Sequence, residues 1–331
     1  MTTHEFYMKR CIELAKNGLG TTYPNPLVGS VIVHDDKIIG EGWHKKAGEP
    51  HAEVNAVNSV KDKTLLKEAT IYVSLEPCSH FGKTPPCCDL IIANEIPNVV
   101  VGTVDPFAKV AGNGIKKLVE SGKNVTVGIL EDECNELNKR FFTFHQKQRP
   151  YIILKWAETA DGFISPISKE EKSPVWITNP YSRQLVHKWR TEEQAILVGT
   201  NTVLDDNPKL DARDFSGNNP IRIVLDKSGK ISENYHVKNN SQKTIFITES
   251  ENFISTENCI YENAIFDIHL ISSICEILYK NNIQSVIIEG GSKTLQSFID
   301  ANLWDEARVF KGDTTFQNGI LAPNISGNPV A

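Results

Sequence analysis

Four residues between positions 51 and 87 have the types and order of a zinc site that keeps one coordination position open. His51 is followed by Glu53, and Cys78 and Cys87 come later in the chain. Zn²⁺ binds well to one imidazole and two thiolates, and a catalytic site leaves the fourth position to a water molecule. We therefore predict that His51, Cys78 and Cys87 are zinc ligands. A carboxylate beside such a site can transfer protons without binding the metal, and we assign this role to Glu53.

The order of these residues is typical of zinc-dependent nucleobase deaminases. In those enzymes a His-x-Glu sequence precedes a Pro-Cys pair, and two residues separate the two Cys ligands. Here Pro77 precedes Cys78, but eight residues separate Cys78 from Cys87. Cys88 is a second candidate for the last ligand, and spacing alone does not exclude it. We favour Cys87 because it closes the segment TPPC.

The secondary structure expected around these residues would bring them together. Apolar and polar residues alternate over positions 71–76, which predicts a strand that ends just before Cys78. Residues 52–60 carry apolar side chains at helical spacing. Because positions i and i+2 do not share a helix face, His51 and Glu53 can approach one metal only at the first turn. We expect the zinc ion to lie off the N-terminus of that helix.

The composition limits the class of protein. A chain of 331 residues is expected to form about two domains. Its formal net charge of −6 argues against a protein that binds by neutralising phosphate backbones. No apolar run reaches the roughly 20 residues of a membrane helix, and the N-terminus lacks the apolar segment of a signal peptide. The seven Cys do not suggest a disulfide framework. We expect a cytoplasmic homo-oligomer, either a dimer or a tetramer, with no nucleic-acid or membrane partner.

The first part of the chain reads as an α/β domain. A helix and a β-hairpin are followed by strands that alternate with helices, which predicts a largely parallel sheet apart from the hairpin. Residues 132–144 are expected to form one polar helix. Because Pro150 cannot continue a helix, we place the domain boundary after Arg149. The expected domains are therefore 1–149 and 150–331.

The second part begins a new series of strands and helices. Residues 194–210 are expected to form a strand followed by a loop, and residues 285–300 a strand, a Gly290–Gly291 turn and a helix from Ser292. Glycines at such a turn let a phosphate approach the backbone, and the helix N-terminus supplies free N–H groups. The turn matches neither the dinucleotide-binding motif nor the P-loop. A turn that only connects the strand to the helix is therefore as good an interpretation as a phosphate-binding turn.

Along essentially its whole length the chain resembles the RibD family of bifunctional riboflavin-biosynthesis deaminase–reductases. The first part carries TYPNPLVGSVIV, HAE and EPCSHFGKTPPC, and the second carries KWAETADG, VWIT, ILVGTNTVLDDNPKL and EGG. The resemblance implies a cytidine-deaminase-like three-layer α/β/α domain followed by a dihydrofolate-reductase-like α/β domain. It also implies deamination of 2,5-diamino-6-(5-phosphoribosylamino)pyrimidin-4-one, a small-molecule substrate, followed by NADPH-dependent reduction of the ribosyl group to ribityl.

The same resemblance implies binding residues in both domains. Near the pyrimidine it places Asn25, His44, His80, Lys83 and Thr84. On the dinucleotide it places Ala157, Trp176, Thr202, Asp206, Gly291, Ser292, Lys293 and Thr294. On the sugar phosphate it places Arg190, Leu210, Arg213 and Glu289. The proton donor of the reduction is left open between Asp206 and Glu289.

Two other classes of protein share parts of this pattern. A tRNA or nucleoside deaminase with an unrelated second domain would use the same zinc chemistry, but the acidic balance and the motifs of the second part argue against it. A binding protein with a structural zinc would have four protein ligands and would not need the carboxylate of Glu53. We therefore predict an enzyme that catalyses two steps.

Overall fold

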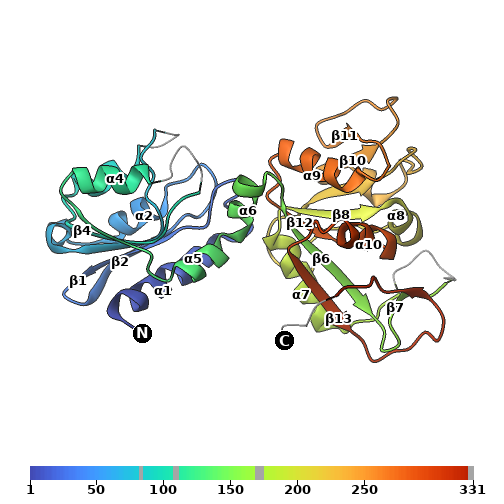
Figure 1. Cartoon of the computed structure of the whole chain (residues 1–331), viewed down its shortest axis with the longest axis horizontal. Coiled ribbons are helices and arrows are strands. Elements are labelled where there is room, and N and C mark those ends of the chain that lie inside the picture. Colours follow the sequence, from blue (N-terminus) through green and yellow to red (C-terminus); the bar gives the residue numbers. More distant parts are fainter. Residues whose placement is uncertain (82–84, 107–111, 168–174, 327–331) are drawn as a thin grey trace. The chain divides into compact units, whose positions relative to one another are not determined.

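The computed structural model describes residues 1–81, 85–106, 112–167 and 175–326. The chain divides into two compact units, Met1–Gln148 and Arg149–Ala331, and each is described by itself (Figure 1). Among the described residues, no helix has both the length and the apolar character needed to cross a membrane.

The first unit is built on a five-stranded sheet of order β2-β1-β3-β4-β5. Its strands are β1 (Gly29–His34), β2 (Lys37–Trp43), β3 (Thr70–Leu75), β4 (Asn98–Thr103) and β5 (Asn124–Val127). Its helices are α1 (Thr3–Ala15), α2 (Ala52–Ser59), α3 (Cys87–Ala93), α4 (Asn113–Glu120), α5 (Glu131–Leu137) and α6 (Lys139–Lys147), with short 3₁₀ helices η1 (Lys16–Gly18) and η2 (Lys63–Glu68). Strand β1 pairs antiparallel with β2 and β3, while β3, β4 and β5 are parallel.

Apolar side chains on both faces of this sheet account for its three layers. Side chains alternate along a strand, so Ile32 of β1 enters one core while Val31 and Val33 enter the other. Helices α2, α3 and α4 contribute to the first core, and α1 and α5 contribute to the second. Figure 1 shows α1 and α5 on one side of the sheet and α2 and α4 on the other. The three-layer arrangement therefore follows from strands that are buried on both faces.

The segment expected to form one polar helix forms two. Helix α5 ends at Leu137 and α6 begins at Lys139, and Asn138 between them has φ −103° and ψ 18°. The Asn138 side chain accepts the N–H of Leu27 and donates to its carbonyl, both at 2.8 Å. This buried pairing with the main chain of Leu27, far away in the sequence, fixes Asn138 between α5 and α6. It interrupts the single helix that the local pattern predicted.

The second unit is built on a seven-stranded sheet of order β11-β10-β9-β8-β12-β6-β13, in which every pair is parallel. Its strands are β6 (Tyr151–Glu158), β8 (Ala195–Gly199), β9 (Ile221–Leu225), β10 (Thr244–Thr248), β11 (Cys259–Asn263), β12 (Ser285–Ile288) and β13 (Glu306–Lys311). Strands β7 (Phe163–Ser165) and β14 (Ile320–Leu321) form a separate antiparallel pair. Its helices are α7 (Pro180–Glu192), α8 (Thr200–Asp206), α9 (Leu270–Lys280) and α10 (Ser292–Asp300), with a 3₁₀ helix η3 (His236–Lys238).

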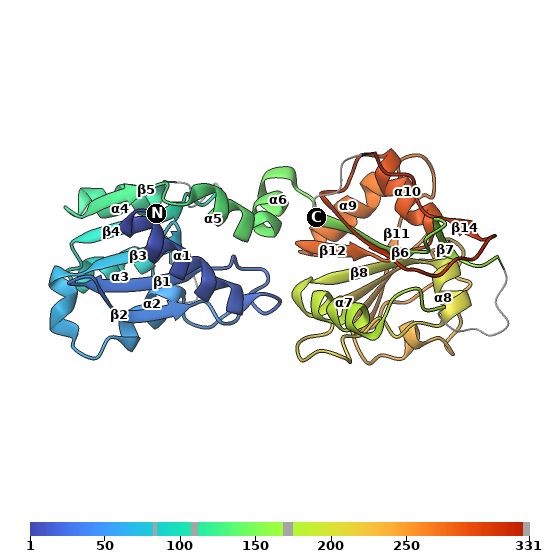
Figure 2. The ribbon, with the colours of Figure 1, turned by 90° about the horizontal axis from the view of Figure 1, so that it is seen from below.

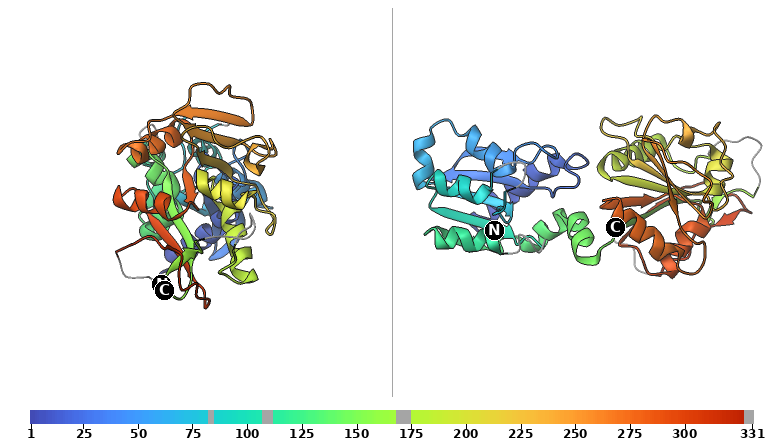
Figure 3. Two further views of the ribbon diagram at one scale, coloured as in Figure 1. Left: turned by 90° about the vertical axis from the view of Figure 1, so that its right-hand side faces the viewer. Right: turned by 90° about the horizontal axis from the view of Figure 1, so that it is seen from above.

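This sheet is also covered on both faces. Figure 2 shows α9 and α10 on one face and α7 and α8 on the other, and the right-hand view of Figure 3 shows these layers from the opposite side. The core clusters agree, because α9 and α10 pack with Ile152 and Leu154 of β6, while Val203 of α8 packs with Val198 and Val224. A parallel sheet needs such helices because its strands are apolar on both faces.

The residues after β8, expected to form a loop, form helix α8 instead. Gly199 caps the helix at its N-terminus, and Asn207 ends it in the left-handed region at φ 41°. Pro208, which suggested the loop, follows directly after this C-terminal residue. Proline is common just after a helix because it cannot continue one. Pro208 therefore marks the end of α8, and the residues before it are helical and do not form a loop.

Candidate active sites

The first candidate site lies where strand β3 leaves the sheet and helices α2 and α3 begin. His51 is the N-cap of α2, Cys78 follows β3, and Cys87 is the first residue of α3. One potential ligand atom from each residue lies within 4.8 Å of the other two. His51 Nδ1 is 3.6 Å from Cys78 Sγ and 3.3 Å from Cys87 Sγ. Ligand atoms around a tetrahedral zinc ion are about 3.5 Å apart, so this donor set fits such an ion.

Hydrogen bonds around Cys78 favour the thiolate, which is the form that binds metals. The Cys87 side chain donates to Cys78, and with His51 it holds the pKa of Cys78 well below its usual range. The main-chain N–H of Cys87 also donates to Cys78 Sγ at 3.3 Å. The first turn of α3 therefore supplies one candidate ligand and stabilises the negative charge of another.

Glu53 lies in the first turn of α2, and only 3% of its surface is exposed. Burial, together with the nearby Cys78, raises the pKa of Glu53 to about 7. A dication bound beside it would favour the charged carboxylate. A carboxyl group whose pKa can be moved in this range is suited to accept and donate protons near neutrality.

Cys88 points away from His51. Its thiol donates to the carbonyls of Pro77 at 3.2 Å and Gly114 at 3.5 Å. Of the two adjacent cysteines, Cys87 is the one that lies beside His51.

His44 lies next to the His51 side chain, and Asn25 contacts His44. Asn25 Nδ2 is 3.0 Å from His44 Nε2, and His44 Nδ1 is 3.2 Å from the carbonyl of Pro50. The rings of His44 and His51 have centroids 5.4 Å apart. Burial lowers the pKa of His44 and so favours the neutral imidazole. A neutral His44 that donates from Nδ1 accepts the Asn25 amide at Nε2, which fixes the orientation of Asn25.

The loop between Cys78 and Cys87 carries the other three predicted pyrimidine residues. His80 is exposed on this loop. Lys83 and Thr84 lie outside the described residues. Of the five predicted residues, the structure therefore brings Asn25 and His44 together beside the His-Cys-Cys cluster.

Glu76 was not among the predicted functional residues, although it belongs to the EPC segment. It is 4% exposed. Its carboxylate accepts four main-chain N–H groups, those of Asp105, Gly112, Gly114 and Ile115. Gly114 also needs its small size, because a Cβ there would lie 2.0 Å from the carbonyl of Pro77. Glu76 thus ties the start of α4 to the main chain that leads to Cys78.

The second candidate site lies in the second unit, at the carboxyl ends of the neighbouring strands β8, β12 and β6. Parallel strands end at the same edge of a sheet, where ligands commonly bind. The predicted dinucleotide residues near this edge are Ala157 in β6, Thr202 in the first turn of α8, Gly291 as the N-cap of α10, and Ser292, Lys293 and Thr294 in its first turn. Asp206 is the last residue of α8. A Cβ at Gly199 would lie 2.9 Å from Thr294 Oγ1, and one at Gly291 would lie 3.9 Å from Thr202 Oγ1. The starts of α8 and α10 are therefore adjacent.

Trp176, the remaining predicted dinucleotide residue, precedes α7 and is 54% exposed. The guanidinium carbon of Arg183 lies 4.5 Å from the centroid of its ring. An exposed indole held by a cation offers a flat apolar surface, but the described contacts of Trp176 do not link it to α8 or α10.

Among the predicted sugar-phosphate residues, Arg190 and Glu289 form a largely buried ion pair. Arg190 Nη2 lies 2.8 Å from Glu289 Oε2, and Arg190 Nη1 donates to the carbonyl of Asp211 at 3.0 Å. Lys155, which the sequence did not single out, lies 3.8 Å from the same Glu289 oxygen. Burial opposes the charge on Glu289, but Arg190 and Lys155 outweigh it and lower the pKa of Glu289 to about 2. Such a carboxyl has no proton to donate near neutrality, which argues against Glu289 as the proton donor of the reduction.

These two sites define a class of protein. One unit has the fold and the His-Cys-Cys-Glu arrangement of a zinc-dependent deaminase, and the other has a parallel sheet with a glycine turn at its carboxyl edge, an arrangement common among nucleotide-binding enzymes. Family models match both parts: "Cytidine and deoxycytidylate deaminase zinc-binding region" matches residues 1–103, and "RibD C-terminal domain" matches residues 150–314.

Relatives match over almost the whole chain. The riboflavin biosynthesis protein RibD of Aquifex aeolicus is 41% identical over 97% of this chain and 87% of its own length. The RibD of Escherichia coli is 36% identical over 98% of this chain and 89% of its own length. The crystal structure of the diaminohydroxyphosphoribosylaminopyrimidine deaminase/5-amino-6-(5-phosphoribosylamino)uracil reductase of Thermotoga maritima has a TM-score of 0.89 and 40% identity, and covers 99% of this chain and 93% of its own.

The chain therefore belongs to the RibD family. It is a bifunctional enzyme of riboflavin biosynthesis, with a deaminase part and a reductase part. The expected mixed α/β fold is confirmed. A tRNA or nucleoside deaminase with an unrelated second domain does not account for the match over residues 150–314.

Proposed function

We propose that this enzyme deaminates 2,5-diamino-6-(5-phosphoribosylamino)pyrimidin-4-one and then reduces the ribosyl side chain of the product to ribityl. One observation carries the proposal: a His-Cys-Cys cluster with a buried glutamate and a glycine turn at a parallel sheet edge occur in one chain that matches RibD proteins along its length. Each site supplies the chemistry of one of the two steps.

We propose that the deaminase part holds Zn²⁺ through His51, Cys78 and Cys87. Such an ion supplies an activated water for hydrolysis. Glu53 accepts a proton from the attacking water and delivers it to a ring nitrogen, and it then transfers the second proton of that water to the amine, which leaves as ammonia. Asn25 orients the pyrimidine, since its amide is fixed by a neutral His44.

We propose that the reductase part binds NADPH at the edge formed by β6, α8 and α10, where the cofactor supplies the hydride. The dinucleotide residues are Ala157, Trp176, Thr202, Asp206, Gly291, Ser292, Lys293 and Thr294. Free N–H groups at the start of α10 are suited to a phosphate of the cofactor. The sugar phosphate is bound by Arg190, Leu210, Arg213 and Glu289, and the guanidinium groups suit a phosphate because each can donate two parallel hydrogen bonds.

We also propose that the enzyme works in the cytoplasm as a homo-oligomer, either a dimer or a tetramer. All seven cysteines are free, which is consistent with a reducing compartment. Sedimentation of the purified protein tests the assembly, and fractionation of cells tests the location.

The decisive experiment is incubation of the purified protein with the diaminopyrimidine phosphate, with and without NADPH, followed by mass spectrometry. Without NADPH we expect a product in which oxygen has replaced an amino group. With NADPH we expect the same product with two additional hydrogen atoms. Ammonia release from a nucleoside or tRNA, with none from the pyrimidine phosphate, would contradict the proposal.

A further inference from the structure

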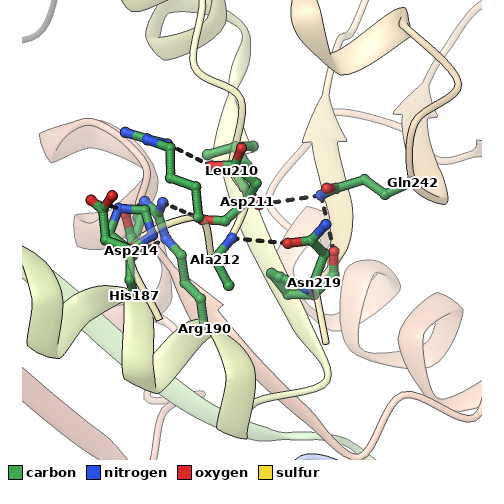
Figure 4. A network of polar contacts seen from close by, with 11 residues as sticks. His187, Arg190, Leu210, Asp211, Ala212, Asp214, Asn219 and Gln242 are labelled. Carbon is green, nitrogen blue, oxygen red and sulfur yellow. Dashed lines mark hydrogen bonds and ion pairs between the residues drawn. The ribbon is translucent and has the colours of Figure 1, made fainter. Parts of the chain in front are cut away.

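The loop of residues 210–220 carries two of the proposed sugar-phosphate residues, and one side chain holds both of its ends. Gln242 Nε2 lies 3.2 Å from the carbonyl of Leu210 and 3.1 Å from the carbonyl of Pro220 (Figure 4). A single amide thus closes the loop at its base. Arg213, the second proposed phosphate residue, lies inside the closed segment.

The conformation that Gln242 holds is an unfavourable one at Leu210. Leu210 has φ +54°, in the left-handed region that non-glycine residues rarely adopt, and it is 3% exposed. Such a backbone persists only where surrounding contacts determine it. Within the loop, Asn219 Oδ1 accepts the N–H of Ala212 at 2.9 Å, which fixes the chain between the two ends.

The main chain of Gln242 is itself fixed by the buried guanidinium of Arg222. Arg222 of β9 is fully buried, and its Nη2 donates to the main-chain carbonyl of Gln242 at 2.9 Å. Its Nη1 donates to the carbonyl of His236 at 2.7 Å, and its Nε donates to Thr244 Oγ1 at 2.8 Å. A buried guanidinium that is satisfied by fixed groups is a rigid support, because breaking any of these bonds leaves a buried donor unpaired.

The loop also contacts the buried ion pair of the proposed reductase site. Arg190 Nη1, from the guanidinium that binds Glu289, donates to the carbonyl of Asp211. The Asp211 carboxylate in turn pairs with Arg213. Figure 4 shows Arg190 directed toward the same stretch of chain that Gln242 holds from the other side. A shift of the loop therefore moves Arg213 relative to Arg190.

We propose that Gln242 is a positioning residue for the reduction, which sets the place of Leu210 and Arg213 and so determines the affinity for the sugar phosphate. The inference rests on the proposed function of the second unit, in which these two residues bind that substrate. Gln242 acts through the loop and does not touch the reacting atoms.

The test is Gln242→Ala in the full-length enzyme, measured in the reduction of deaminated substrate. Loss of two hydrogen bonds to the loop should raise the KM for the sugar phosphate about tenfold. The kcat and the KM for NADPH should stay close to those of the parent, because only binding of one substrate is affected. Gln242→Met, which keeps the length of the side chain but cannot donate, should give the same result.

Gln194→Ala is the matched control in the same unit. Gln194 is also half-buried; its Nε2 donates to the carbonyl of Asn282 at 3.0 Å, and its Oε1 accepts the N–H of Gln284 at 2.8 Å. This variant loses as many bonds to main chain, but none to the loop. It should lower the melting temperature about as much as Gln242→Ala while leaving the KM for the sugar phosphate unchanged.

The outcomes separate this inference from the proposed function. An unchanged KM for the sugar phosphate in both Gln242 variants would overturn the positioning role. So would a fall in kcat accompanied by similar increases in the KM for the sugar phosphate and the KM for NADPH. Arg213→Ala serves as the reference: if it raises the KM for the sugar phosphate and Gln242→Ala does not, only the inference fails. If the parent enzyme does not reduce the sugar phosphate at all, the proposed function fails instead.

Discussion

At the scale of single residues, the buried carboxyl of Glu53 is the group whose role can be separated most cleanly from metal binding. Glu53→Gln keeps the size and shape of the side chain but cannot accept a proton. We expect the variant to retain about one zinc ion per chain and to lose at least about 100-fold in deamination rate. Metal analysis and an ammonia-release assay measure the two properties. A variant that deaminates within about tenfold of the parent would remove Glu53 from the mechanism.

Cys87 and Cys88 offer a matched pair of neighbouring substitutions. Cys87 lies beside His51, whereas the Cys88 thiol donates to main-chain carbonyls. We expect Cys87→Ser to lose zinc and deamination, and Cys88→Ser to keep both with only a loss of stability. Zinc content after dialysis and thermal unfolding check this prediction. Equal loss of zinc from the two variants would mean that the third ligand has been misplaced.

The sequence singled out residues whose chemistry is local to a motif. His51, Glu53, Cys78 and Cys87 lie within one short stretch, and the structure brings them together. Lys155 was missed because a lysine on an apolar strand has no local signal, and its partner Glu289 directly follows another strand, β12. Contacts between distant strands depend on the order of the sheet, which periodicity does not determine.

At the scale of elements, Glu76 connects the zinc-binding segment to helix α4. Glu76→Gln replaces one carboxylate oxygen by an amide that cannot accept the N–H groups around it. Each buried donor left unpaired costs about 1–3 kcal/mol, so we expect a lower melting temperature. We also expect faster loss of zinc to a chelator, because Pro77 and Cys78 follow directly on Glu76.

Glu41→Gln is a suitable control for Glu76→Gln, since Glu41 forms a partly exposed pair with Arg10 in the same unit. Exposed pairs contribute about 0–1 kcal/mol, so its effect on unfolding should be small. Thermal unfolding and the rate of zinc release are measured on both variants. The same unfolding temperature and release rate in both would show that Glu76 does not support the zinc segment.

Helices and strands were predicted correctly where the local sequence pattern determines them. They were missed where a contact with a distant part of the chain determines where the element ends. The opening helix and the strand-turn-helix around Gly290–Gly291 are found as expected, and α1 begins with a capping box formed by Thr2 and Glu5. The single helix expected over residues 132–144 is broken by the pairing of Asn138 with Leu27. The sequence of residues 132–144 contains no pattern that predicts Leu27 as the partner of Asn138.

At the scale of the whole molecule, the alternation of strands and helices was enough to predict two α/β parts. The sequence placed the boundary after Arg149, and the contacts divide the chain after Gln148. The order of the strands was not predicted, because hydrophobic patterns show which faces of a strand are buried but not which strand lies beside it. That order is what places the starts of α8 and α10 next to each other.

The last prediction is that the two activities are independent within the one chain. The first unit contains the His-Cys-Cys cluster and its own cores, and the second contains the parallel sheet, the glycine turn and the ion pair of Arg190 with Glu289. Units of this size bury about 70% of their unfolded surface, which is sufficient for each to fold. Removal of zinc by a chelator should therefore abolish deamination and leave reduction of already deaminated substrate intact.

The converse substitution completes this test. Asp206→Ala, at the end of α8, should impair reduction and leave deamination unchanged, and deamination should not depend on NADPH. Ammonia release and NADPH consumption are measured on the same preparations, with circular dichroism to show that each protein remains folded. If either treatment abolished both activities in folded protein, the two steps would share one site, and the assignment of one reaction to each unit would be wrong.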